Sequence, residues 1–220
     1  MSTRVAVLAS GRGSHFQALA DAARAGALPI QLIGLFSDRP DAPVVERANA
    51  LGIPVWAERP DKQAPRVDFD RRLFAALDEI QPSLIVCAGF MRIINGSVLT
   101  PWSARMINIH PSLLPRHRGL HTHRRALDSG DREHGASVHF VTAELDGGPV
   151  IAQARVPVVS GDDETSLAAR VLAREHPLLA QSVLGITQGR LQLHADGVRF
   201  DGRTLQSPCQ LDAQDRLVCA

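Results

Sequence analysis

The apolar positions along the first half of the chain predict strands that alternate with helices. Short, mostly apolar runs are typical of strands buried in a parallel sheet, and they occur at residues 4–8, 30–36, 84–88 and 106–110. Apolar residues recur at helical spacing in residues 16–23, 44–51 and 69–80. Ile53–Trp56 is a short strand expected at a sheet edge, because Pro54 lacks the N–H that an inner strand needs.

The second half adds elements of a different kind. Helices are predicted at residues 122–127 and 164–184, strands at 136–141 and 150–159, and hairpin turns at Asp196-Gly197 and Asp201-Gly202. Pro177 should kink the second of these helices. We therefore expect an α/β, Rossmann-like single domain with a mostly parallel central sheet, helices on both faces and an antiparallel extension toward the C-terminus.

Composition narrows the class of protein. The chain has 220 residues, is 45% hydrophobic, and carries 24 Lys and Arg against 23 Asp and Glu. Nothing in this pattern resembles a basic stripe for nucleic acid or a polybasic membrane patch. The three cysteines are too scattered for a disulfide framework, and Met1–Arg4 leads directly into a strand rather than a signal peptide. A cytoplasmic protein with no nucleic-acid or membrane partner is expected.

The strand at residues 106–110 carries the most suggestive chemistry. Asn108 and His110 are two apart, so their side chains project to the same face, and Pro111 ends the strand just beyond them. An amide donor beside an imidazole is suited to acyl-transfer chemistry. The alternative is a strand-end histidine that merely bonds to the backbone.

A glycine loop follows the first strand and precedes the first helix. Its residues Ser10–Ser14 could bring backbone N–H groups to a phosphate, although the third glycine of a dinucleotide fingerprint is replaced by Phe16. The alternative is an ordinary strand-to-helix turn. The apolar loop Gly89–Ile94, at the end of another strand, could wall a pocket for a flat heterocycle or simply pack on the core.

Other polar residues have competing interpretations. Asp146 is the best carboxylate partner for His110, whose pKa it would raise, but an Asp in a Gly-Gly-Pro loop is more often a turn residue. Glu175 is expected on a solvated helix surface. The six histidines between residues 110 and 139 lack the spacing of a zinc site, so no metal is expected. A Gly-x-Ser-x-Gly nucleophile motif is absent, which favours direct transfer over an acyl-enzyme.

Three motifs identify a family resemblance. They are Asn108–Pro115 continued by Gly119–His123, Ser137–Thr142 with Asp146–Ile151, and Ala88–Ile93. From about Val5 to about Arg190 the chain resembles the folate-dependent phosphoribosylglycinamide formyltransferases of purine biosynthesis. The resemblance implies a formyltransferase domain at residues 1–190, whose N-terminal half binds the nucleotide phosphate and whose C-terminal half completes the folate site. Residues 191–220 would form a C-terminal hairpin or tail of the same domain.

The resemblance also implies substrates and residue roles. The formyl group of 10-formyltetrahydrofolate, as cosubstrate and without a metal, would move to the amine of 5-phosphoribosylglycinamide. The implied catalytic set is Asn108, His110 and Asp146. Phosphate and ribose would be bound by Ser10, Gly11, Arg12, Gly13, Ser14, His15 and Glu175. Folate would be bound by Arg66, Phe90, Met91, Arg92, Ile93, Ile94, Thr142, Ala143 and Glu144. Pro111, Gly119, His121 and His139 would support the active site.

The chain departs from the family pattern at two positions, and three other functions were considered. His15 stands where the family usually has Asn, and Arg118 where proline is common, which predicts a more basic and more mobile loop at residues 116–119. A methionyl-tRNA formyltransferase should carry a further basic domain, and a formyltetrahydrofolate deformylase, a hydrolase, an extra domain before the first strand. A non-catalytic nucleotide-binding module would leave the catalytic set unexplained. The sequence leaves a homodimer open.

Overall fold

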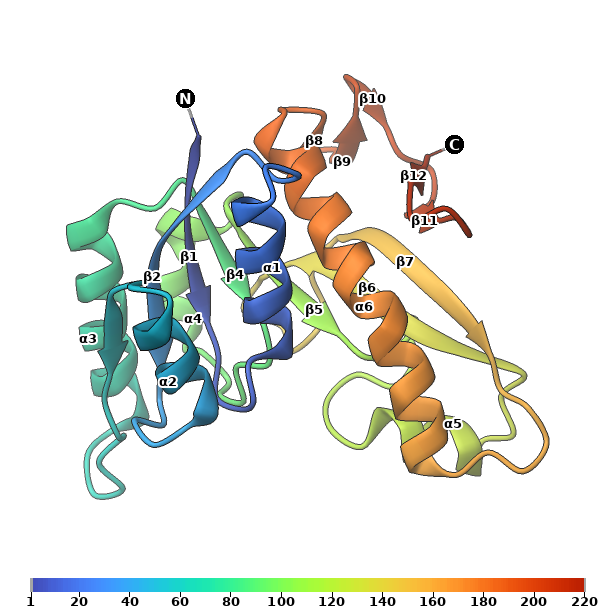
Figure 1. Ribbon diagram of the computed structural model, residues 1–220, viewed down its shortest axis with the longest axis horizontal. Helices are drawn as coiled ribbons and strands as arrows, with labels where there is room; N and C mark the ends of the chain where they lie inside the picture. Colours follow the sequence, from blue (N-terminus) through green and yellow to red (C-terminus); the bar gives the residue numbers. More distant parts are fainter. Residues whose placement is uncertain (1, 220) are drawn as a thin grey trace. The chain divides into compact units, whose positions relative to one another are not determined.

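The computed structural model describes residues 2–219, and its contacts divide the chain into two compact units, residues 1–108 and 109–220 (Figure 1). The N-terminal unit contains strands β1 (Thr3–Leu8), β2 (Ile30–Ser37), β3 (Val55–Ala57) and β4 (Leu84–Cys87), and strand β5 (Met106–His110) crosses the boundary. Its helices are α1 (Ser14–Arg24), α2 (Pro43–Ala50), α3 (Arg66–Ile80) and α4 (Gly96–Leu99), followed by a 3-10 turn at Thr100–Trp102.

The sheet of the N-terminal unit is entirely parallel, with the order β3-β2-β1-β4-β5. Val5–Leu8 of β1 are buried completely, as expected for a central strand covered on both faces. The strand order reverses between β1 and β4, so the loops that follow these two strands emerge side by side. Open α/β sheets bind ligands at this switch point.

The C-terminal unit is built on an antiparallel pair, β6 (Glu133–Phe140) and β7 (Val150–Pro157). Strand β11 (Cys209–Leu211) joins β7 in parallel, and β12 (Leu217–Val218) pairs with β11 in antiparallel. Helix α6 (Glu164–Thr187) packs along β6 and β7 and contacts α5 (Thr122–Asp128) (Figure 1). A separate antiparallel sheet contains β8 (Leu191–His194), β9 (Gly197–Phe200) and β10 (Arg203–Thr204).

The predicted fold class is confirmed, and both predicted hairpin turns lie between the strands of the small sheet. Some local predictions were wrong. Helix α3 begins at Arg66 after Pro65, three residues before the predicted start at residue 69. The short elements α4, β11 and β12 were not predicted, because two to four residues carry no readable periodicity.

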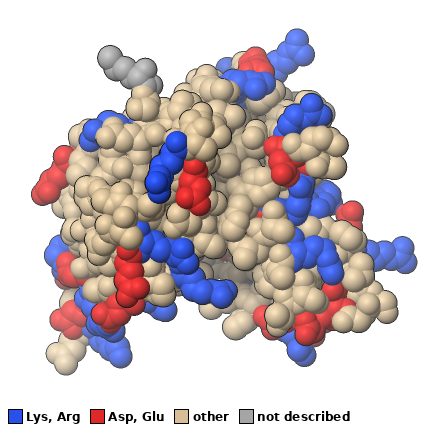
Figure 2. Space-filling view, in the orientation of Figure 1, with Lys and Arg blue, Asp and Glu red and all other residues tan. Residues whose placement is uncertain are grey.

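The sequence also led to expectations about disulfides, surface charge and membrane association. Cys209 and Cys219 are joined by a disulfide, contrary to the expectation from their scattered positions, because β11 and β12 fold back on each other. On the face shown in Figure 2, basic and acidic side chains are interspersed. None of the described helices is long and apolar enough to cross a membrane. The cytoplasmic location, the homodimer and the division at residue 190 stay predictions.

Candidate active site

Strand β5 carries Asn108 and His110, the two residues predicted to lie on one face of the strand end. Asn108 is partly exposed and pairs in register with Cys87 of β4, whereas His110 is buried. The strand ends at His110, and the chain turns at Pro111, where the N–H of Ser112 donates to the His110 carbonyl at 2.9 Å. The local sequence therefore places an amide and an imidazole on one face of the strand end, as predicted.

The C-terminal unit brings Asp146 to His110. Nδ1 of His110 is 3.5 Å from Oδ2 of Asp146, and Nε2 of His139 is 3.7 Å from the other carboxylate oxygen. The N–H of Gly119 donates to Oδ2 of Asp146 at 2.8 Å. The structure thus confirms that Asp146 is a partner of His110, and it places the predicted supporting residues Gly119 and His139 in direct contact with that carboxylate.

The hydrogen bond at the second ring nitrogen of His110 favours one tautomer. Nε2 is 3.1 Å from the carbonyl oxygen of His117. A carbonyl only accepts hydrogen bonds, so the hydrogen of the neutral ring belongs on Nε2. A second proton would bind at Nδ1, directly against Asp146. Sequence reasoning missed His117 in this role, because a backbone contact leaves no side-chain signal.

Burial lowers the pKa of His110, and this effect outweighs the opposing influence of the Asp146 carboxylate and the His117 carbonyl. The expectation that the Asp146 carboxylate raises the pKa of His110 is confirmed, but burial lowers this pKa by more, so the net shift is downward. Burial alone would raise the pKa of Asp146, but His139, His110 and the Gly119 N–H together hold it below its ordinary value. At neutral pH the pair is accordingly a neutral imidazole beside a carboxylate.

The loop that carries Asp146 is shaped by close backbone approach. Asp146 adopts a positive φ of 46°. A Cβ atom added to Gly148 would lie 1.8 Å from the carbonyl oxygen of Phe140, so only glycine fits there. The N–H of Phe140 donates to Pro149 O at 3.0 Å and closes the loop at its base.

A histidine cluster lies in the same unit. Nε2 of His117 is 2.7 Å from Oδ2 of Asp131, and Nδ1 of His123 is 3.1 Å from Nε2 of His134. Burial, reinforced by His123 and His117, lowers the pKa of His134 to about 4. Among residues 2–219, no group of three or more His, Cys, Asp or Glu side chains could hold a metal ion.

The glycine loop of the N-terminal unit joins β1 to α1. Gly13 precedes the helix with φ +76°, and a Cβ there would lie 2.5 Å from Cγ2 of Val44. The first turn of α1 has neither a side-chain cap nor an acidic residue, so its positive end is open to an anion. Gly11 and Arg12 are exposed, and Ser14 and His15 are partly exposed.

Ser10 has a different place in this loop. It is buried, and its hydroxyl donates to Oδ1 of Asp38 at 2.5 Å and accepts the N–H of Met91 at 2.9 Å. Its own N–H donates to Gly89 O at 3.0 Å. Ser10 therefore ties the loop after β1 to the loop after β4.

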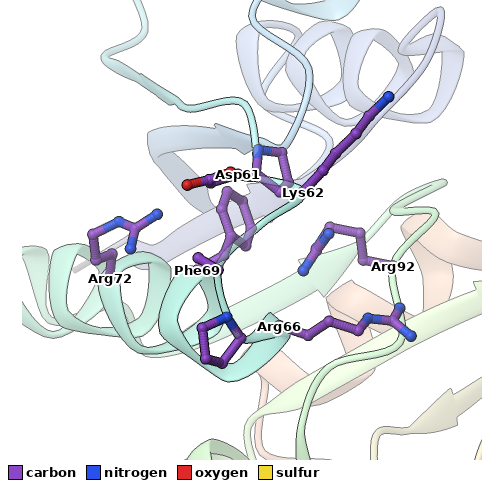
Figure 3. Close-up of a pocket in the computed structure, with 9 residues that line it drawn as sticks. Asp61, Lys62, Arg66, Phe69, Arg72 and Arg92 are labelled. Atoms are coloured by element: carbon purple, nitrogen blue, oxygen red, sulfur yellow. The ribbon is translucent and has the colours of Figure 1, made fainter.

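The loop after β4 exposes apolar side chains. Met91 and Ile93 are 61% and 55% exposed, and Phe90, Arg92 and Ile94 are partly buried. Beside this loop lies a pocket of about 150 Å³ with four basic side chains and one acidic side chain in its wall (Figure 3). The residues that line it are Pro60, Asp61, Lys62, Ala64, Pro65, Arg66, Phe69, Arg72 and Arg92.

The remaining predicted residues lie in the C-terminal unit. Glu175 on α6 is buried, so its expected position on a solvated surface is wrong. Thr142 donates through Oγ1 to the carbonyl of Glu144 at 3.4 Å, while Ala143 is exposed. The carboxylate of Glu144 forms a partly exposed ion pair with Arg118. The expected mobility of the loop at residues 116–119 stays a prediction. His121 has a positive φ of 58° and precedes helix α5.

Comparisons with known proteins point to one family. Residues 3–183 match the family model described as formyl transferase. The chain is 44% identical over 201 residues to the phosphoribosylglycinamide formyltransferase of Escherichia coli (strain K12), covering 91% of this chain and 95% of that protein. The solved phosphoribosylglycinamide formyltransferase of Coxiella burnetii is 42% identical, with a TM-score of 0.88 over 93% of this chain and 96% of that one.

A more distant structure shares the fold. The formyltetrahydrofolate deformylase of Pseudomonas syringae pv. tomato has a TM-score of 0.85 at 22% identity, over 91% of this chain and 66% of that one. At this identity the likeness concerns the fold alone.

Proposed function

The chain belongs to the formyl transferase family, and from this premise we propose that it transfers the formyl group of 10-formyltetrahydrofolate to the amine of 5-phosphoribosylglycinamide. The products are 5-phosphoribosyl-N-formylglycinamide and tetrahydrofolate. The observation that carries the proposal is the contact of Asp146 with Nδ1 of His110, at the end of the strand that also carries Asn108.

Transfer is direct in this proposal, because three buried side chains, those of Cys87, Ser112 and Ser137, are poor acyl acceptors. Burial raises the pKa of the Cys87 thiol to about 12, so almost no thiolate forms at neutral pH. The buried hydroxyl of Ser112 donates to Arg116 O at 2.7 Å, and that of Ser137 donates to Ser112 O at 2.7 Å. The proposed nucleophile is therefore the substrate amine.

The proposed transfer passes through a tetrahedral intermediate. The amine nitrogen forms a bond to the formyl carbon, whose carbonyl oxygen becomes an oxyanion. Asn108 donates a hydrogen bond to this oxygen, and His110, charged by a proton at Nδ1 beside Asp146, stabilises the negative charge. The bond from carbon to N10 of the folate then breaks. The amine loses one proton and N10 gains one, and the pair of His110 and Asp146 carries that proton between them.

The proposed substrate contacts include the N-terminal end of α1 and the apolar loop Gly89–Ile94. The turn at Gly11–His15 offers backbone N–H groups and the positive end of α1 to the nucleotide phosphate. Glu175 binds the ribose hydroxyls. The exposed side chains of Met91 and Ile93 contact the pteridine, and Arg66 binds the acidic glutamate tail. Residues 142–144 are the folate-binding residues proposed in the C-terminal unit.

The alternative is a deformylase, a hydrolase with which the chain shares the fold alone. Both reactions start from 10-formyltetrahydrofolate, but only the transferase needs the nucleotide amine. We would incubate the protein with 10-formyltetrahydrofolate, with and without 5-phosphoribosylglycinamide, and quantify formylated nucleotide and formate. Formylated nucleotide only in the complete mixture supports the proposal, and formate release without the nucleotide supports the deformylase.

A further inference from the structure

A buried carboxylate contacts the segment that follows β4 in the N-terminal unit. Asp70 is on helix α3, and its side chain is 3% exposed. Its Oδ2 accepts the N–H of Asn95 at 2.9 Å, at the start of α4. Its Oδ1 is 3.7 Å from Nη2 of Arg92. A single carboxylate therefore restrains two positions of the segment that follows β4.

Arg92 depends on this carboxylate. Its side chain is 14% exposed, and its Cζ atom lies 4.5 Å from the ring centroid of Phe69. Its Nε atom is buried and has no hydrogen-bond partner. In Figure 3 the guanidinium of Arg92 turns toward Phe69, while Arg66 extends past it. A guanidinium placed in this way is costly unless an anion faces it, and Asp70 is that anion.

The two residues next to Arg92 expose their side chains to solvent. Met91 and Ile93 flank Arg92 in the chain, and both are more than half exposed although they are large and apolar. The N–H of Met91 is fixed by Ser10 at 2.9 Å, so the backbone is restrained on both sides of Arg92. With Arg92 inward and the backbone fixed on both sides, Met91 and Ile93 expose their apolar side chains.

We propose that Asp70 is a positioning residue for the folate cosubstrate, resting on the proposed function. It touches no substrate itself. It keeps Arg92 inward and the start of α4 in place, so that Met91 and Ile93 are presented to the flat heterocycle before it binds. A site ordered in advance does not spend binding energy on ordering the loop.

The test uses Asp70→Asn, which removes the charge but keeps an oxygen for the Asn95 N–H. The matched control is Asp68→Asn on the same helix, where the carboxylate forms an exposed pair with Arg71. We expect Asp70→Asn to raise the KM for 10-formyltetrahydrofolate and the Kd of tetrahydrofolate, measured by calorimetry, by about tenfold. The kcat and the KM for the nucleotide should change less than about threefold, and the control should match wild type.

A double variant separates positioning from general destabilisation. Arg92→Gln removes the buried cation, so Asp70→Asn should add no further loss of folate affinity in that background, and the double variant should fold even if Asp70→Asn alone does not. The proposal is overturned if Asp70→Asn leaves folate KM unchanged, if it alters kcat and nucleotide KM equally, or if the two substitutions multiply. Failure of wild type to bind tetrahydrofolate or transfer formyl would instead overturn the proposed function.

Discussion

Replacing Asp146 by Asn tests the central contact of the candidate site. The substitution removes the charge that faces Nδ1 of His110 but preserves size and an acceptor for the Gly119 N–H. Since an anion stabilises imidazolium, its removal must lower the pKa of His110 further below the ordinary value. Protonated His110 then becomes harder to form in the transition state.

The size of the effect follows from the geometry. Two unit charges 3.5 Å apart interact by about 5 kcal/mol at an effective dielectric constant of about 20. Local relaxation and water reduce such pairs to about 1–3 pKa units, which is about 1.4–4 kcal/mol. If the charged ring is needed in the transition state, kcat/KM should fall by about 10- to 10³-fold.

The measurement combines steady-state kinetics with an NMR titration of the His110 ring. Asp128→Asn is the matched control in the same unit, because Asp128 pairs with Arg124 and both side chains are mostly exposed. We expect the control to match wild type in both measurements. A variant Asp146→Asn that keeps kcat/KM within about threefold, or that leaves the His110 pKa unchanged or raised, would refute the reasoning.

Three further predictions concern acid stability, loop shape and the folate tail. The pKa of His134 is about 4 in the folded protein and 6.5 for the ordinary group. As the pH falls, the unfolded state therefore binds a proton at this histidine before the folded state does, and the free energy of unfolding should fall by about 3 kcal/mol from pH 6.5 to 4. Urea melts of His134→Gln should lack this part of the pH dependence, and an unchanged pH dependence in that variant would contradict the prediction. Gly148→Ala forces a Cβ against Phe140 O, which should cost about 1–3 kcal/mol in thermal melts and displace Asp146 enough to lower kcat; full activity would count against the loop geometry. Arg66→Gln should raise the KM for polyglutamylated cosubstrate more than for the monoglutamate, whereas equal changes in kinetic assays would remove the tail assignment.

Local sequence patterns were sufficient to predict the end of strand β5 and the glycine loop between β1 and α1. The apolar run at residues 106–110 and the proline after it place Asn108 and His110 on one face of a strand end, because strand periodicity and proline chemistry act over only a few residues. The glycine loop between β1 and α1 follows from the same kind of local information. These features need no knowledge of the rest of the chain.

Packing decided the remaining features. Asp146 meets His110 across 35 intervening residues, and Glu175 is buried although its helical surroundings suggested exposure. The sign of the His110 pKa shift depends on how much water burial removes, which no spacing reveals. Asp70 had no motif, since its partners Arg92 and Asn95 lie more than 20 residues away.

The sequence by itself therefore determined the fold class and the chemical groups at the end of β5. The sequence also offered Asp146 as a partner of His110, but only the tertiary structure decided that its carboxylate lies against Nδ1 of the imidazole. It also decided which buried charge orders the loop after β4. The physical reason is that periodicity and turn chemistry act between near neighbours, whereas burial and charge pairing arise only when distant segments pack together.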